Sequence, residues 1–247
     1  MGSLSGKRAW ITGASSGIGA ATARVLSQNG AAVVLSSRRE DRLRALSQEL
    51  TPAVIKPVDV ANRTAMERLG EELEAMGGVD ILVANAGLMP LSPILEGRVD
   101  EWERMIDVNV KGLLYSINAV YPGMARRKRG HIVNVGSVAG RFANKNGAVY
   151  SGTKFAVRAI SDGLRKEALA YGVRVTDIEP GAVATELADS IKHEPTRKLA
   201  TGPGGVYGPG LEILEAEDIA NAIYYAVSQP ERVNVSELLI RPRTQER

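Results

Sequence analysis

Short apolar runs alternate with longer amphipathic stretches along the whole chain. The apolar runs are rich in Val and Ile and show no polar alternation, which is typical of strands covered on both faces. This pattern predicts strands at 8–13, 31–37, 53–60, 79–87, 131–137, 173–181 and 236–242. The amphipathic stretches predict helices at 17–30, 40–50, 63–77, 100–128, 149–171 and 216–228.

The order of these elements predicts the architecture. Strand–helix–strand alternation favours right-handed crossovers between parallel strands. We therefore predict one α/β domain over residues 1–247, a doubly wound parallel sheet of about seven strands with helices on both faces. Segment 193–218 breaks the rhythm with a cluster of Pro and Gly. Loops of this length in a compact domain more often bind or cover a ligand than lie disordered on the surface. We therefore expect a substrate lid around 186–215. The alternative is a disordered surface loop.

Composition narrows the function classes. Hydrophobic residues make up 44% and charged residues 24% of the 247 residues, as in ordinary soluble proteins. Thirty-one basic residues against 28 acidic ones leave a net charge of +3, which does not indicate a nucleic-acid partner. We see no apolar stretch of about 18 residues and no signal-peptide pattern, so we expect no membrane association. The lack of cysteine excludes disulfide and thiolate chemistry and fits a cytoplasmic protein.

The first strand-to-helix turn carries a glycine motif. In TGASSGIG (12–19), Gly13, Gly17 and Gly19 have the spacing G-x-x-x-G-x-G. Glycine allows positive φ and a close approach of backbone to ligand, and the N-terminus of the next helix favours a pyrophosphate. With a strand before it and a helix after it, the motif predicts a Rossmann-type dinucleotide site rather than a mere tight turn.

The end of the second predicted strand indicates which dinucleotide binds. An NAD site places an acidic residue there to accept from the ribose 2′-OH. This chain has Ser37, Arg38 and Arg39 instead, with no carboxylate before Glu40. A guanidinium can hold a 2′-phosphate, so we predict NADP(H), with Arg38 as the main contact. The alternative, a solvated basic helix start, is disfavoured because cations sit poorly at helix N-termini.

The segment YSGTK (150–154) predicts proton chemistry. Tyr150 and Lys154 are four residues apart and share a helix face. A free tyrosine has a pKa of about 10, and a nearby ammonium lowers it, so this tyrosine could exchange a proton with an alcohol oxygen. Ser137 lies at the carboxyl end of a predicted strand, where ligands bind in this architecture, and its hydroxyl could hold the substrate oxygen.

Together these motifs resemble the short-chain dehydrogenase/reductase superfamily over nearly the whole chain. The matching segments, in order, are 12–19, NAG (85–87), DVNVKG (107–112), VGSVAG (135–140), 150–154 and EPG (179–181). Within the superfamily the chain is similar to the NADP-dependent serine/3-hydroxy acid dehydrogenases and related carbonyl reductases, through MIDVNVKGLLY (105–115), RVTDIEPG (174–181) and the ending RPRTQ.

The resemblance implies a catalytic tetrad. Tyr150 would be the acid/base, and Lys154 would hold the nicotinamide ribose and lower the pKa of Tyr150. Ser137 would orient the substrate carbonyl, and Asn109 would anchor a water on the proton path. The residues implied along the cofactor are Gly13, Ser15, Ser16, Gly17, Ile18, Gly19, Ser37, Arg38, Arg39, Asp59, Val60, Asn85, Ala86, Gly87, Tyr150, Lys154, Pro180, Gly181, Val183 and Thr185.

Two positions depart from the family pattern. Ala84 stands where the family usually has Asn, which affects strand support rather than chemistry. Ala14, Ser15 and Ser16 are neutral where many NADP-dependent members carry a basic residue, so the predicted NADP preference rests on Arg38 and Arg39.

These observations predict an NADP(H)-dependent carbonyl reductase or alcohol dehydrogenase, which interconverts an alcohol and a ketone or aldehyde by hydride transfer. The alternatives are a 3-ketoacyl-carrier-protein reductase, with the basic run 125–130 as docking site, and a non-catalytic NADP-sensing protein. That basic run is more simply explained as favourable charge at a helix C-terminus. Two separated histidines and no cysteine make a metal site improbable, and His193 could contact substrate from the lid edge. The resemblance implies a homo-oligomer, dimer or tetramer.

Overall fold

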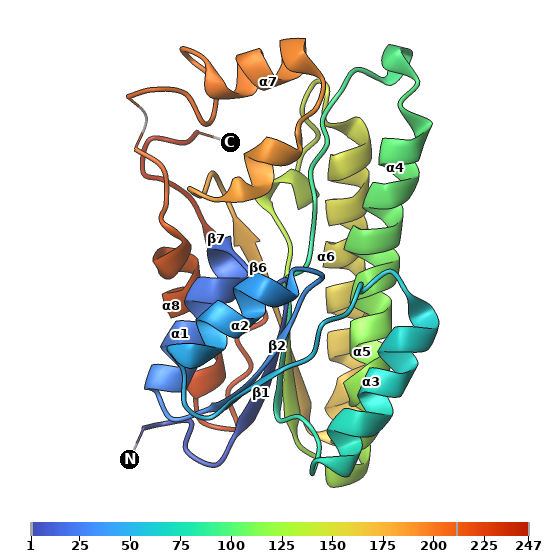
Figure 1. The fold of residues 1–247 in the computed structure, drawn as a ribbon, viewed down its shortest axis with the longest axis vertical. Helices are drawn as coiled ribbons and strands as arrows, with labels where there is room; N and C mark the ends of the chain where they lie inside the picture. The colour runs from blue at the N-terminus through green and yellow to red at the C-terminus, as the bar shows by residue number, and fades with distance from the viewer. Residues whose placement is uncertain (1, 211, 247) are drawn as a thin grey trace.

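Seven parallel strands form one sheet in the computed structural model, which describes residues 2–210 and 212–246. The sheet order is β3-β2-β1-β4-β5-β6-β7 (Figure 1). The strands are β1 (Arg8–Thr12), β2 (Ala32–Ser36), β3 (Ala53–Ile55), β4 (Ile81–Ala84), β5 (Gly130–Val135), β6 (Val173–Pro180) and β7 (Glu237–Ile240). Every predicted strand is present and shorter than its predicted range, so the sequence pattern located the sheet correctly.

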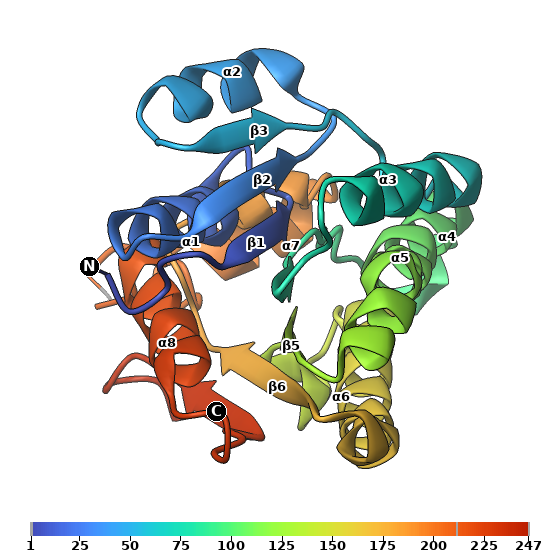
Figure 2. The same cartoon turned by 90° about the horizontal axis from the view of Figure 1, so that it is seen from below.

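Helices cover both faces of the sheet. They are α1 (Gly17–Gln28), α2 (Glu40–Gln48), α3 (Arg63–Ala75), α4 (Val99–Ile106), α5 (Gly112–Arg127), α6 (Ala148–Ala168), α7 (Glu194–Thr201) and α8 (Ala216–Ser228). In Figure 2, α1, α2 and α8 lie on one side of the sheet, and α3, α4, α5 and α6 lie on the other. Successive strand residues enter different cores: Ile11 packs with the first group and Trp10 with the second. Both are fully buried, as a doubly covered strand requires.

The predicted helix at 100–128 is interrupted. After α4, the backbone forms a π-helical turn at Asp107–Lys111 before α5 begins. Such turns are rare and frequently mark functional sites, and this one contains the predicted site residue Asn109. The other long helix, α6, begins at Ala148 and continues into a 3₁₀ turn at Leu169–Tyr171.

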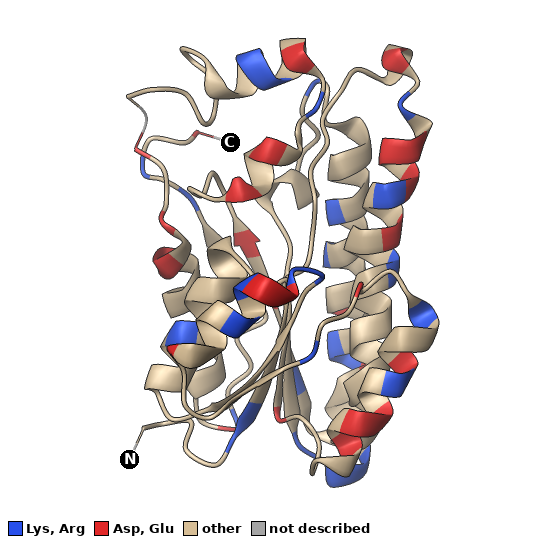
Figure 3. Cartoon of the chain, viewed as in Figure 1, with Lys and Arg blue, Asp and Glu red and all other residues tan. Residues whose placement is uncertain are grey.

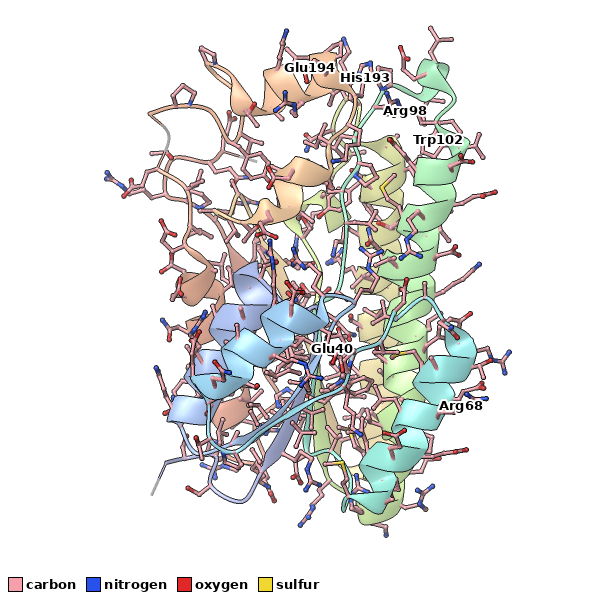
Figure 4. The ribbon with its side chains drawn as sticks, in the orientation of Figure 1. Glu40, Arg68, Arg98, Trp102, His193 and Glu194 are labelled. Atoms are coloured by element: carbon pink, nitrogen blue, oxygen red, sulfur yellow. The ribbon has the colours of Figure 1, made fainter. Side chains whose placement is uncertain are left out.

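The segment predicted to be a lid carries secondary structure in its described residues. It holds a 3₁₀ turn, Glu186–Ser190, followed by α7, and the backbone of Leu214 pairs with Val183. Apolar residues of this segment pack into one cluster with Trp102 of α4. Figure 4 shows His193 and Glu194 at the same end of the molecule as Arg98 and Trp102. The role of this segment as a substrate lid stays a prediction.

The sheet order changes direction between β1 and β4, because β2 and β3 lie on one side of β1 while β4 to β7 continue on the other. In doubly wound folds, ligands bind outside the carboxyl ends of the strands at this switch point.

Lys and Arg are interspersed with Asp and Glu on the helices of both layers (Figure 3). Among the described residues, no helix is both long enough and apolar enough to cross a membrane.

Candidate active site

A cleft of about 440 Å³ opens at the switch point, where the strands β1, β4, β5 and β6 end. Most of the predicted site residues line it. They are Gly13, Ser15, Ser16, Gly17, Ile18, Ser37, Arg38, Arg39, Asp59, Val60, Asn85, Ala86, Gly87, Ser137, Tyr150, Lys154, Pro180, Gly181, Val183 and Thr185. The structure thus gathers residues from seven separate segments into one site. The predicted residues Gly19 and Asn109 do not line the cleft.

The glycine turn has the geometry that a pyrophosphate site needs. Gly13 and Gly17 have positive φ values of 66° and 52°, and a Cβ on Gly19 would lie 2.4 Å from the carbonyl oxygen of Gly13. Helix α1 begins at Gly17, and its N-cap residue Ser16 makes no side-chain capping bond. The N–H groups of the first turn therefore face the cleft without a protein cap, which suits an anionic group.

Arginine side chains lie beside the serines of the glycine turn and beside Asp59. The Arg39 guanidinium donates to the Ser15 hydroxyl through Nε at 3.0 Å and Nη2 at 2.8 Å, and to the Ser16 hydroxyl at 2.6 Å. Arg104 donates to Asp59 Oδ2 at 2.6 Å. A phosphate could bind here beside guanidinium and hydroxyl donors. The structure places Arg39 on the glycine-turn serines, whereas the sequence reasoning favoured Arg38 as the main contact.

The three residues predicted to carry the chemistry meet at the opposite end of the cleft. Tyr150 and Lys154 belong to the first two turns of α6, and each is only 7% exposed. The Lys154 Nζ lies 5.9 Å from the centre of the Tyr150 ring and donates to the Val135 carbonyl at 2.8 Å. Ser137 follows β5 and begins the next turn, where its hydroxyl accepts from the Ala139 N–H at 3.1 Å. One carbonyl oxygen could therefore be placed among these groups.

Burial shifts the pKa values of Tyr150 and Lys154. It raises the pKa of the Tyr150 phenol above its usual value, and the Ser137 hydroxyl acts in the opposite direction. It also lowers the pKa of Lys154 to about 8, and the charge of Asp177 opposes that shift. Burial removes the hydration of the phenolate and so disfavours the charged form of Tyr150. The lowering of the Tyr150 pKa by Lys154 stays a prediction.

Asn109 lies behind the wall of the cleft, where its side chain is hydrogen-bonded to neighbouring segments. Its Nδ2 donates to the Leu88 carbonyl at 3.0 Å and to the Thr153 hydroxyl at 3.1 Å, and its Oδ1 accepts from the Leu88 N–H at 2.9 Å. Thr153 in turn donates to the Tyr150 carbonyl at 2.7 Å. The side chain thus ties the π-helical turn to α6, and its predicted role in holding a water stays a prediction.

Two cleft residues were not predicted as site residues. Arg104 and Gln245 line the cleft, and Gln245 Oε1 accepts from the Ala182 N–H at 2.8 Å. The amphipathic pattern of its helix does not distinguish Arg104, and the ending RPRTQ, which contains Gln245, indicated a family likeness but no role in the site. Tyr207, which also lines the cleft, lies in the segment predicted to be a lid. His193, considered as a substrate contact, instead caps α7 through the Thr196 N–H and does not line the cleft.

The fold and the cleft define a class of protein first: a doubly wound α/β protein whose cleft lies at the switch point, where such folds bind nucleotides. The family model for short chain dehydrogenases matches residues 7–196. The chain therefore belongs to the short-chain dehydrogenase/reductase family, as the sequence motifs indicated.

Comparison with known proteins supports this assignment. An uncharacterized oxidoreductase of Staphylococcus saprophyticus is 44% identical over 250 residues and covers 99% of both chains. The closed form of a serine dehydrogenase complexed with NADP+ is 38% identical, with a TM-score of 0.89 over 97% of this chain and 96% of its own. An alcohol dehydrogenase from the archaeon Thermococcus sibiricus, complexed with 5-hydroxy-NADP, is 31% identical, with a TM-score of 0.84 over 98% of each chain.

Proposed function

We propose that this protein is an NADP(H)-dependent oxidoreductase that interconverts an alcohol and a ketone or aldehyde. The observation that carries the proposal is that Ser137, Tyr150 and Lys154 share one cleft with the glycine turn and with Arg39. The two solved relatives described above contain NADP+ and 5-hydroxy-NADP, and the serines and arginine at the phosphate end of this chain suit the same type of cofactor.

The side chains suggest how the reaction would proceed. A bound nicotinamide would supply or accept the hydride. In reduction, the Tyr150 phenol would donate its proton to the carbonyl oxygen, which the Ser137 hydroxyl would hold in place. The raised pKa of Tyr150 keeps the phenol protonated at neutral pH, as a proton donor requires. Lys154, with a pKa of about 8, would be a cation at neutral pH and would stabilise the phenolate left behind.

The substrate end of the cleft favours an uncharged molecule. Apolar residues that line it include Met89, Leu91, Val138, Leu187 and Val206. Among the described residues that line this end, Lys154 is the one cation, and its Nζ is already bonded to the Val135 carbonyl. A substrate carboxylate would be desolvated there without a partner, which is costly. We therefore propose a neutral ketone or aldehyde with an apolar body.

The carrier-protein alternative has a geometric difficulty. The basic run 125–130 ends α5 and leads into the amino end of β5, whereas the cleft lies at the carboxyl ends of the strands. Arg126 and Arg127 are also paired with Glu74 of α3. A carrier docked on this run would sit at the opposite end of the sheet from Tyr150, so we favour a free small-molecule substrate.

A substrate panel tests the function and the substrate class together. We expect NADPH absorbance to fall with neutral ketones or aldehydes. For a 3-keto ester compared with its 3-keto acid, kcat/KM should be at least ~10-fold higher for the ester, because the acid buries an unpaired charge. Binding of NADPH without turnover across the panel would favour the sensor alternative, and preference for the acid would refute the neutral substrate class.

A further inference from the structure

A carboxylate from the proposed lid reaches the phosphate end of the cleft. Glu186 opens the 3₁₀ turn that follows β6, and its Oε2 accepts from Arg39 Nη1 at 2.7 Å. Its Oε1 accepts from Arg42 Nη1 at 2.6 Å. Arg39 and Arg42 flank the start of α2, which Figure 4 marks with Glu40. The two ion pairs therefore join opposite walls of the cleft.

A second contact brings the same segment against the glycine turn. A Cβ on Gly17 would lie 3.0 Å from the Thr185 methyl group, so the residue before Glu186 packs directly on the start of α1. Residues 185 and 186 thus cross the region where the backbone N–H groups of α1 and the Arg39 guanidinium would both meet the cofactor phosphates.

The donors of Arg39 are largely occupied in this arrangement. Its Nε and Nη2 bond to Ser15 and Ser16, and its Nη1 bonds to Glu186. A guanidinium has five N–H donors, and carboxylate and phosphate groups compete for the same planar face. A 2′-phosphate that arrives at Arg39 would also be repelled by the Glu186 carboxylate.

Glu186 stays ionised at neutral pH. The hydrogen bonds from Arg39 and Arg42 lower the pKa of its carboxyl group to about 2. Its side chain is 45% exposed, so water screens each ion pair and neither is strong. A dianionic phosphate can therefore displace this carboxylate, whereas a group without charge gains little by doing so.

We propose that Glu186 is a specificity-determining residue that competes with the 2′-phosphate of NADP(H) for Arg39. Because NAD(H) carries a hydroxyl at that position, only NADP(H) must displace the carboxylate. Glu186 therefore restrains the preference for NADP(H), and its displacement releases the first turn of the lid from α2. This inference rests on the proposed use of a nicotinamide cofactor.

The test is the variant Glu186→Gln, which removes the charge and keeps the size. Dissociation constants for NADPH and NADH are measured at low salt by fluorescence titration, without substrate. We expect NADPH to bind roughly three- to tenfold more tightly than to the wild type, as the loss of two exposed ion pairs allows, with NADH nearly unchanged. The fragment 2′,5′-ADP should show the same gain, and 5′-ADP should not.

The matched control is Glu49→Gln. Glu49 pairs with Arg24 at 2.7 Å with a similar exposed fraction and does not line the cleft, so the affinities should not change. Weaker NADPH binding in Glu186→Gln would overturn the proposal, because Glu186 would then be a clasp over the bound cofactor. Equal shifts for NADPH and NADH would also overturn it. If the wild type bound neither dinucleotide, the proposed function itself would fail.

Discussion

At the scale of single residues, the burial of two ionisable side chains, Lys154 and Asp177, determines the electrostatics of the site. Lys154 and Asp177 approach the same peptide unit: the ammonium donates to the Val135 carbonyl at 2.8 Å, and a Cβ on Gly136 would lie 2.5 Å from Asp177 Oδ1. Asp177 is 2% exposed, and burial raises the pKa of its carboxyl group to about 7. The anionic form of Asp177 stabilises the Lys154 ammonium at a cost in folding stability.

This cost predicts a pH-dependent effect of Asp177→Asn. Between the usual pKa of 3.8 and about 7, the folded chain keeps a proton that the unfolded chain has released, so Asp177 destabilises folding progressively as pH rises. Asparagine does not titrate. The free energy of unfolding of the variant should therefore rise relative to the wild type across this window, by up to about 4 kcal/mol. Urea unfolding at several pH values measures the difference, and a difference that stays constant with pH would contradict it.

At the scale of elements, the turn between β1 and α1 depends on close backbone contact. Gly19 is buried, and a Cβ there would lie 2.4 Å from the Gly13 carbonyl and 2.7 Å from Asn85 Nδ2. Asn85 itself donates to the Thr12 carbonyl at 3.0 Å and so links the turn to the end of β4. The turn cannot shift without disturbing that link.

We therefore expect Gly19→Ala to destabilise the fold by roughly 1–3 kcal/mol, as overpacking does, and to weaken NADPH and NADH binding together. Urea unfolding and fluorescence titration measure both effects. The control is Gly163→Ala in α6, where a Cβ meets no atom within 4 Å; it should be neutral or stabilise the helix by up to ~1 kcal/mol. Unchanged cofactor affinity and stability in Gly19→Ala would show that the turn tolerates a side chain.

At the scale of the whole molecule, local pattern was a good guide to the fold and a poor guide to contacts across the cleft. Val- and Ile-rich runs located every strand, because burial on both faces leaves a direct signal in the sequence. The π-helical turn was missed because its residues keep the helical periodicity. Glu186 was missed because its partners Arg39 and Arg42 are far from it in sequence. Burial raises the pKa of Tyr150, and the packing that causes this shift is encoded by no motif.

The predicted assembly also belongs to this scale. Exposed apolar side chains lie on the long helices of one layer: Ile106 at the end of α4, Leu114 in α5 and Phe155 in α6, each 42% to 43% exposed. Singly exposed apolar side chains are normal on a protein surface, so the homo-oligomer that the family resemblance implies stays a prediction.

The measurement that tests the central claim most directly is the turnover of Tyr150→Phe. The variant removes the phenolic proton and little else. We expect kcat for carbonyl reduction to fall by at least ~100-fold, the low end of acid–base contributions, with the NADPH dissociation constant nearly unchanged. Tyr225→Phe, on the exposed face of α8, is the matched control and should retain full turnover. Near-normal turnover of Tyr150→Phe would contradict the proposed role of Tyr150.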